Sequence, residues 1–168
     1  MLAGHNARPA TRYVGVPIDL RRDWPTALRH SGFEPAHPTA WSAEGLLPYL
    51  PSESQDLLFE RIDELSAPGS RITVEAFGAD FFSAEAIERR RTRMAQARRA
   101  AVEAGLDDLP DTAALWYFEP RADVAQWLTD RGWEVETIDA PDLVEHYQRP
   151  PTDLEVVPDT TFVDATKV

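Results

Sequence analysis

Strand-like and helix-like segments alternate along this chain, and the alternation restricts the possible folds more than any other feature. Short segments rich in β-branched, aromatic and other apolar residues are separated by longer segments with apolar residues at helical spacing. Strands separated by helices need parallel crossovers, and a parallel sheet is normally covered by helices on both faces. The pattern therefore predicts an α/β fold.

The expected elements can be assigned from these patterns and from the glycines and prolines that interrupt them. The expected strands are Arg12–Ile18, Thr39–Ala43, Arg71–Phe77, Ala114–Phe118, Trp133–Ile138 and Thr161–Thr166. The expected helices are Trp24–His30, a helix beginning at Ser52, Ala84–Ala104, Arg121–Asp130 and Pro141–Tyr147. The last strand follows a long connection that contains prolines, so it is able to turn back and run antiparallel.

The helix that begins at Ser52 has the clearest start signal. Gln55 lies three residues after Ser52, which is the spacing of a capping box. Leu58, Ile62 and Leu65 then repeat at helical intervals and are expected to form one buried face.

Composition excludes several classes of function. A net charge of −12 argues against a nucleic-acid partner, because phosphate contacts need a basic surface. No apolar run approaches the roughly 20 residues that cross a bilayer, and the first twelve residues are too polar for a signal peptide. The absence of cysteine excludes disulfides and thiolate metal sites, and the four histidines lack metal-ligand spacing. We therefore expect a soluble, cytoplasmic protein without a metal site.

Six arginines lie in the expected helix over residues 84–104, and two interpretations remain open. They are Arg89, Arg90, Arg91, Arg93, Arg98 and Arg99. They spread around most of the helix, which is typical of a solvated helix whose arginines pair with nearby acids. The alternative is a basic lid over an anionic ligand.

Two acids follow directly on expected strands and are the first candidates for a binding site. Asp19 ends the first strand and Glu44 ends the second. Ligands of open α/β sheets bind beyond the carboxyl ends of the strands, where a carboxylate can accept hydrogen bonds from an amino group, a ribose or an ammonium group. Each acid is also able to cap the next helix instead. The sequence contains no Gly-x-Ser-x-Gly, no phosphate-binding loop and no Gly-x-Gly-x-x-Gly.

Several strings together resemble the leucine carboxyl methyltransferase superfamily, and within it an actinobacterial branch of S-adenosylmethionine-dependent methyltransferases. The first is Val-Pro-Ile-Asp-Leu at 16–20, followed by Asp-Trp-Pro at 23–25. The most specific is Ala-Glu-Gly-Leu-Leu-Pro-Tyr-Leu at 43–50. Pro-Gly-Ser at 68–70, Val-Glu-Ala-Phe at 74–77, Trp-Tyr at 116–117 and Gly-Trp at 132–133 extend the resemblance over essentially the whole chain.

The resemblance implies a Rossmann-like, seven-stranded methyltransferase sheet with a reversed last strand. It also implies that S-adenosylmethionine is the methyl donor. Asp19 and Leu20 would contact its adenine end, Asp19 accepting from the amino group and Leu20 offering a backbone contact. Glu44 would face the donor as the acid after the fourth strand of that sheet.

The chain departs from the family because the Gly-rich turn and the ribose-binding acid of other members lie upstream of its first residue. Residues 1–168 are therefore expected to be the C-terminal portion of the domain, with the first two strands absent. The alternative is a non-catalytic remnant or interaction module that does not bind the donor.

The resemblance implies methyl transfer to an oxygen atom of a small molecule. A carboxylate acceptor needs no general base, whereas a hydroxyl needs one, and no compelling base stands out in the sequence, which favours a carboxylate. No catalytic residue is assigned. Residues 78–115 are the least sheet-like stretch and are expected to form a lid over the acceptor.

Overall fold

The computed structural model describes residues 11–78, 81, 83–103, 105, 115–148 and 160–168. The chain divides into two compact units, residues 1–34 and residues 35–168, and each is described by itself.

The first unit contains helix α1, Trp24–His30. Asp23 caps the helix, because its carboxylate accepts a hydrogen bond of 3.2 Å from the amide of Thr26. The strand expected at 12–18 is wrong: these residues have no regular structure, and most are exposed. A strand needs a neighbouring strand for its backbone groups, and the described part of this unit provides none.

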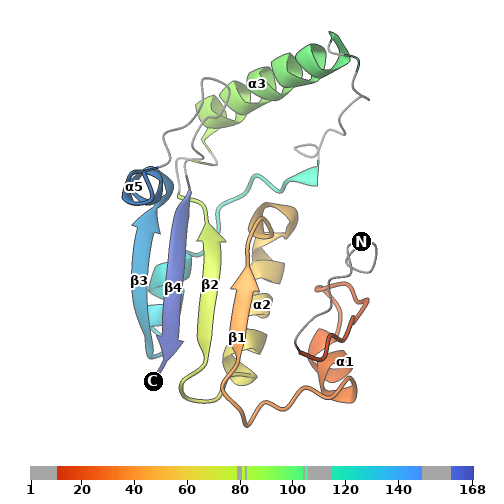
Figure 1. The fold of residues 1–168 in the computed structure, drawn as a ribbon, viewed down its shortest axis with the longest axis vertical. Coiled ribbons are helices and arrows are strands. Elements are labelled where there is room, and N and C mark those ends of the chain that lie inside the picture. The colour runs from red at the N-terminus through yellow and green to blue at the C-terminus, as the bar shows by residue number, and fades with distance from the viewer. Residues whose placement is uncertain (1–10, 79–80, 82, 104, 106–114, 149–159) are drawn as a thin grey trace. The chain divides into compact units, whose positions relative to one another are not determined.

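The second unit contains a four-stranded sheet among its described residues (Figure 1). The strands are β1 Ala40–Ala43, β2 Arg71–Ala76, β3 Trp133–Asp139 and β4 Thr161–Lys167, in the order β1-β2-β4-β3. β1 and β2 are parallel, whereas β4 runs antiparallel to both β2 and β3. The expected α/β class and the reversed last strand are therefore confirmed.

Residues 115–118 form no strand, so the strand predicted there is wrong as far as the described residues extend. The remaining elements are η2 Leu47–Tyr49, α2 Ser52–Glu64, α3 Ala84–Glu103, α4 Val124–Thr129 and α5 Ala140–His146. None of the helices among the described residues is long and apolar enough to cross a membrane.

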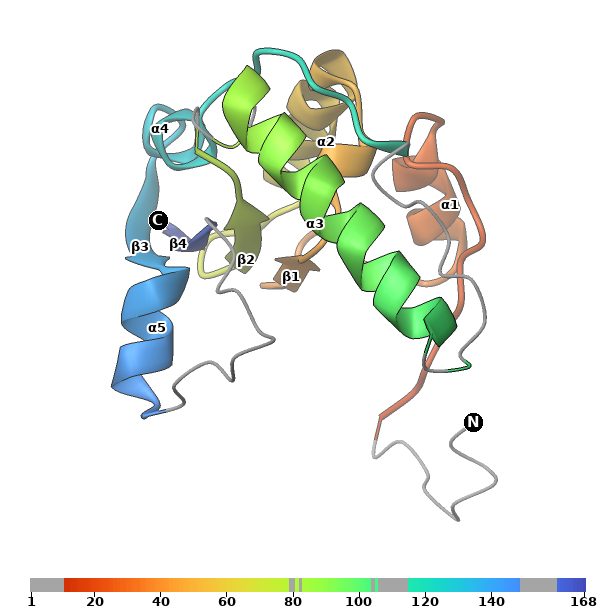
Figure 2. The ribbon, with the colours of Figure 1, turned by 90° about the horizontal axis from the view of Figure 1, so that it is seen from above.

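The core lies between the sheet and helices α2 and α4, which cover the same face (Figure 2). Ile72 and Val74 of β2 and Val163 of β4 alternate with exposed or half-buried residues and are almost fully buried. Phe59 of α2 packs against Trp127 of α4, with ring centroids 5.8 Å apart. The register of β1 and β2 follows from their parallel pairing, which places Ala43 opposite Val74.

The capping box predicted at Ser52 does not form. Pro51 occupies the N-cap position, and the amide of Ser52 donates instead to the carboxylate of Glu119. Gln55 is buried, and its side-chain amide donates to the carbonyl of Ala122 at 3.1 Å. A tertiary contact has therefore replaced the local cap.

Helix α4 begins later than the sequence suggests, at Val124 rather than Arg121. Asp123 caps it by accepting a hydrogen bond of 2.8 Å from the amide of Gln126. Arg121 lies outside the helix, where its side chain is free to turn toward other segments of the chain.

Candidate functional site

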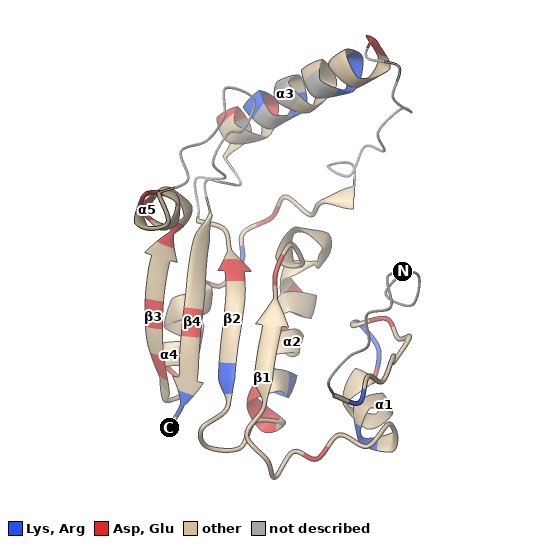
Figure 3. Cartoon of the chain, viewed as in Figure 1, with Lys and Arg blue, Asp and Glu red and all other residues tan. Residues whose placement is uncertain are grey.

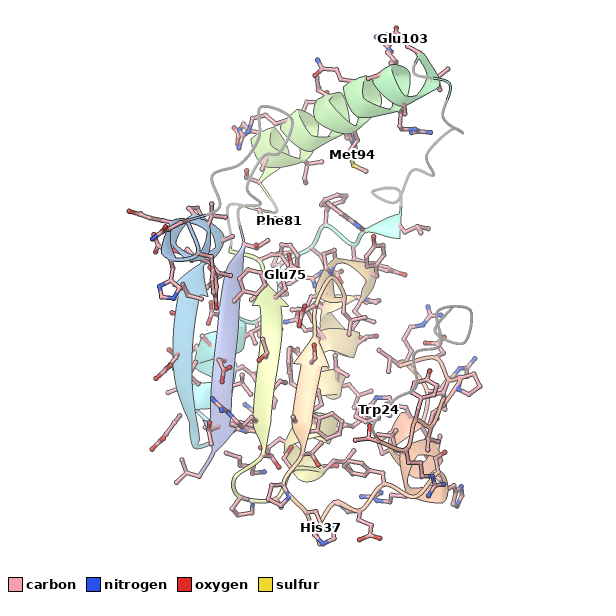
Figure 4. All side chains as sticks on the ribbon, in the orientation of Figure 1. Trp24, His37, Glu75, Phe81, Met94 and Glu103 are labelled. Carbon is pink, nitrogen blue, oxygen red and sulfur yellow. The ribbon has the colours of Figure 1, made fainter. Side chains whose placement is uncertain are left out.

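Two acids meet at the carboxyl ends of β1 and β2. Glu44 directly follows β1, is exposed, and accepts a hydrogen bond of 2.9 Å from the hydroxyl of Ser42. Glu75 lies next to the end of β2 (Figure 4), and its carboxylate accepts a hydrogen bond of 2.8 Å from the amide of Gly45. Gly45 has a φ of 61°, a conformation that glycine adopts without strain. The turn after β1 is thus fixed to β2 beside Glu44.

Sequence reasoning selected Glu44 but missed Glu75. Glu75 occupies an outward position in an alternating strand, next to buried Val74 and Ala76, where an acid is normally a solvated surface residue. Its place one residue before the end of the strand was the signal that could have identified it. An acidic residue, Asp139, also lies at the carboxyl end of β3 (Figure 3).

Asp19 and Leu20 lie in the first unit, whereas Glu44 lies in the second. Asp19 lies in a turn, where its Oδ1 accepts from the amide of Arg21 at 2.9 Å. The guanidinium of Arg21 donates to both carboxylate oxygens, from Nε to Oδ1 at 3.0 Å and from Nη2 to Oδ2 at 2.6 Å. These hydrogen bonds lower the pKa of Asp19 from its ordinary value of 3.8 to about 2. Leu20 is half-buried.

Arg121 connects the turn after β1 to the segment that precedes α4. Its Nη1 donates to the carbonyl of Leu47 at 2.8 Å and to Gln55 at 3.1 Å. Its Nη2 donates to the carbonyls of Tyr117 at 3.0 Å and Leu50 at 3.3 Å. Burial lowers the pKa of Arg121, and the nearby carboxylate of Glu119 partly opposes this. An arginine remains charged even so, and the guanidinium of Arg121 donates mainly to main-chain carbonyls.

Two adjoining cavities lie at the carboxyl ends of β2 and β3. The first has a volume of about 390 Å³ and includes Ser83, Phe118 and Glu119 in its lining. The second has a volume of about 340 Å³ and reaches Asp139 at the end of β3 and Thr161 at the start of β4. Phe77, Arg121, Ala122 and Asp123 line both cavities. Sequence reasoning identified none of these residues.

Aromatic side chains stand behind the first cavity. Phe77 contacts Phe81, with ring centroids 4.2 Å apart, and Phe81 contacts Trp116 at 5.8 Å. Trp116 in turn contacts Phe118 at 6.1 Å and Tyr49 of η2 at 6.3 Å. One aromatic cluster thus joins the end of β2, η2 and the segment before α4.

The stretch expected to form a lid, residues 78–115, contains α3. Arg89, Arg91 and Arg99 are exposed and Arg98 is half-buried, while the side chains of Arg90 and Arg93 lie outside the described residues. The choice between a solvated helix and a basic lid stays open. Within the described part of the chain, no group of three or more His, Asp or Glu residues could hold a metal ion.

Comparison with known proteins supports the family resemblance found in the sequence. Residues 1–63 match the family described as leucine carboxyl methyltransferase. A protein of Mycolicibacterium paratuberculosis is 52% identical over 169 residues, covering 99% of this chain and 53% of the relative. A protein of Mycobacteroides abscessus is 52% identical over 163 residues, covering 96% of this chain and 52% of the relative.

A third relative, from Mycobacterium tuberculosis, is 46% identical over 168 residues, covering 99% of this chain and 54% of the relative. All three carry the name "Putative S-adenosyl-L-methionine-dependent methyltransferase". The resemblance to this group is therefore confirmed along nearly the whole chain. The chain spans about half the length of the curated relatives it matches.

Proposed function

We propose that this chain forms part of an S-adenosylmethionine-dependent methyltransferase that methylates an oxygen atom of a small molecule, because its first 63 residues match the leucine carboxyl methyltransferase family. The observation that carries the proposal is the identity of about half of all residues to the relatives over nearly the whole chain. The strand order with a reversed last strand supports a place for these strands in a seven-stranded sheet. The absence of cysteine is compatible with the cytoplasm as the location.

The residues at the ends of β1 and β2 fit the polar groups of the donor. Glu44 is exposed at the carboxyl end of β1, with Glu75 at the neighbouring strand end. Carboxylates in this position suit an ammonium group or ribose hydroxyls, which donate hydrogen bonds. We propose that Glu44 binds the donor and that Glu75 positions the turn that carries Glu44.

Asp19 fits the adenine amino group under one condition. Both of its carboxylate oxygens accept hydrogen bonds from Arg21. An adenine amino group must therefore share the carboxylate with Arg21 or displace it. Leu20, next in the chain, would contact the adenine through its backbone.

The donor supplies a methyl group already activated on a sulfonium. The protein then has to hold the acceptor in line with that methyl group and exclude water. We propose that residues 78–115, with α3, provide the exclusion of water. No nucleic-acid partner is proposed, because the chain carries a net charge of −12.

Calorimetric titration of S-adenosylmethionine tests the donor proposal. The chain is titrated alone and after mixing with the part of the Mycolicibacterium paratuberculosis relative that it does not match. Because this sequence has no Gly-rich nucleoside cradle, we expect little binding by the chain alone and clear binding by the mixture.

Glu44→Gln should weaken donor binding by the mixture, since it removes a charge and keeps the shape. Glu60→Gln, at an exposed position of α2, is the matched control and should leave it unchanged. A mixture that folds and does not bind the donor would contradict the proposal and favour the interaction module.

A further inference from the structure

We infer that the two adjoining cavities at the carboxyl ends of β2 and β3 bind the methyl acceptor, and that this acceptor is a neutral or positively charged aromatic molecule, not a carboxylate. The inference rests on the proposed function, because only a methyltransferase has a methyl acceptor. Its evidence is the chemistry of the cavity walls.

The position and size of the cavities suit a small molecule. Together they extend from Phe77 at the end of β2 to Asp139 at the end of β3 and Thr161 at the start of β4. Their volumes, about 390 and 340 Å³, are in the range of ligand pockets. The carboxyl edge of an α/β sheet is also the edge at which ligands bind. Glu44 and Glu75 lie at the same edge, at the ends of β1 and β2.

The charges that line the cavities are mainly negative. Asp123 lines both cavities, Glu119 the first and Asp139 the second. The hydroxyl of Thr161 donates to Oδ1 of Asp139 at 2.6 Å, which fixes the orientation of that carboxylate. A bound anion would be repelled by three carboxylates, whereas an ammonium group or a hydroxyl can donate to them.

Arg121 is the cation that lines both cavities, and its single charge offsets only one of these three acids. Its two Nη atoms donate to the carbonyls of Leu47, Leu50 and Tyr117 and to the side chain of Gln55. A ligand carboxylate would have to compete with these acceptors for the guanidinium. The walls therefore select against the carboxylate acceptor that the sequence favoured.

The aromatic residues in the walls favour a ligand that contains an aromatic ring. Phe77 and Phe118 line the first cavity, and Phe81, which is 4% exposed, packs behind Phe77. Aromatic rings favour edge or offset contacts with another ring and attract cations to their faces. A flat ring that carries a hydroxyl or an ammonium group satisfies both the aromatic and the acidic parts of the lining.

Three probes with one ring and three charges test this inference: tyramine, tyrosol and 4-hydroxyphenylacetate, which are positive, neutral and negative. Their affinities for the full 168-residue chain are measured by ligand-observed NMR, without the methyl donor. We expect tyramine to bind about tenfold more tightly than 4-hydroxyphenylacetate, with tyrosol between them, which corresponds to about 1.4 kcal/mol. Equal or tighter binding of the anion, or no binding of any probe, would overturn the inference.

Substitutions locate the binding. Asp123→Asn keeps a good helix cap, and Asp139→Asn keeps an oxygen for Thr161. Each should weaken tyramine several-fold and leave tyrosol within about twofold. Asp130→Asn, an exposed residue at the other end of α4, is the matched control and should change neither. Unchanged tyramine binding in both cavity variants, or the same loss in the control, would contradict the assignment.

Phe118→Leu examines the aromatic wall separately. It should weaken all three probes by a similar factor and preserve their order, because it removes ring contact without changing charge. A changed order of the probes would contradict this role of Phe118. If the mixture binds the donor but the chain does not prefer tyramine to 4-hydroxyphenylacetate, only this inference is contradicted. If the chain shows that preference but the mixture does not bind the donor, only the proposed function is contradicted.

Discussion

The carboxylate of Glu75 accepts a hydrogen bond of 2.8 Å from the backbone amide of Gly45, joining the end of β2 to the turn after β1. The bond forms between residues 30 positions apart in the chain. It holds the turn in a left-handed conformation, with a φ of 61° at Gly45. The position of Glu44, the preceding residue, therefore depends on the side chain of a neighbouring strand.

The first prediction concerns the backbone of Gly45. Gly45→Ala should lower the free energy of unfolding by about 1 kcal/mol, because alanine is strained in the left-handed region. An added Cβ would meet no atom within 4 Å, so the cost comes from the backbone alone. Gly45→Asn should cost less, because asparagine tolerates this conformation. Urea unfolding checks the order, and equal losses in the two variants would contradict it.

The strands and helices were predicted well where the pattern of apolar residues within each element is enough to identify it. The buried alternation of β2 and the helical spacing in α2 are local, so both elements were found. The start of α2 at Ser52 was found, but its capping box was wrong because the amide of Ser52 donates to Glu119, which lies 67 residues away. The segment 12–18 has strand-forming residues, but propensity alone makes no strand without a neighbour.

In the candidate site, too, the residues with a local sequence signal were found and those placed by contacts between distant segments were missed. Asp19 and Glu44 could be named because each follows an expected strand end, and their roles as donor ligands remain predictions. Arg121 was not found because its hydrogen bonds reach carbonyls up to 74 residues away, which no local pattern encodes. Asp139 was not selected, because it falls one residue after the expected strand Trp133–Ile138, and the cavity beside it is lined by residues of β2, β4 and the segment before α4.

The second prediction concerns the titration of Asp19. Arg21 lowers the pKa of Asp19 to about 2, below the ordinary value of 3.8. A depressed carboxyl pKa means that the pair stabilises the turn above pH 3.8 and that this contribution is lost as the pH falls through about 2. Arg21→Gln should return the pKa toward 3.8, as measured by carboxyl carbon NMR. A midpoint that stays near 2 in this variant would show that another group holds the charge.

The third prediction concerns Asp63, near the end of α2. Its Oδ1 accepts from the indole of Trp133 at 2.8 Å and from the ammonium of Lys167 at 2.9 Å, so it joins α2 to β3 and β4. Asp63→Asn keeps an acceptor for one partner and should cost about 1 kcal/mol of unfolding free energy. Asp63→Ala leaves the buried indole of Trp133 without this acceptor and leaves Lys167 with only the main-chain carbonyl of residue 63, so it should cost about 2–3 kcal/mol. Urea unfolding measures both, and a smaller loss for alanine than for asparagine would contradict the argument.

The last prediction concerns Arg121, whose guanidinium ties the turn after β1 to the segment before α4. Arg121→Lys keeps the charge but replaces a planar fork by a single ammonium, which cannot serve the four acceptors in the same geometry. We expect a loss of about 2–3 kcal/mol in the free energy of unfolding, because main-chain carbonyls in a half-buried site lose their donors.

A local measurement separates this role from general destabilisation. The amide of Leu50 donates to the carbonyl of Leu47, and the amide of Tyr117 donates to that of Pro48. The first bond lies within the turn after β1, and the second joins this turn to the segment before α4. Both amides should therefore exchange faster with solvent in Arg121→Lys. Arg71→Lys is the matched control, since Arg71 forms an exposed ion pair with Asp164, and such pairs contribute little. Unchanged protection of Leu50 and Tyr117, with stability within about 0.5 kcal/mol of the parent chain, would show that the turn after β1 holds its shape without Arg121.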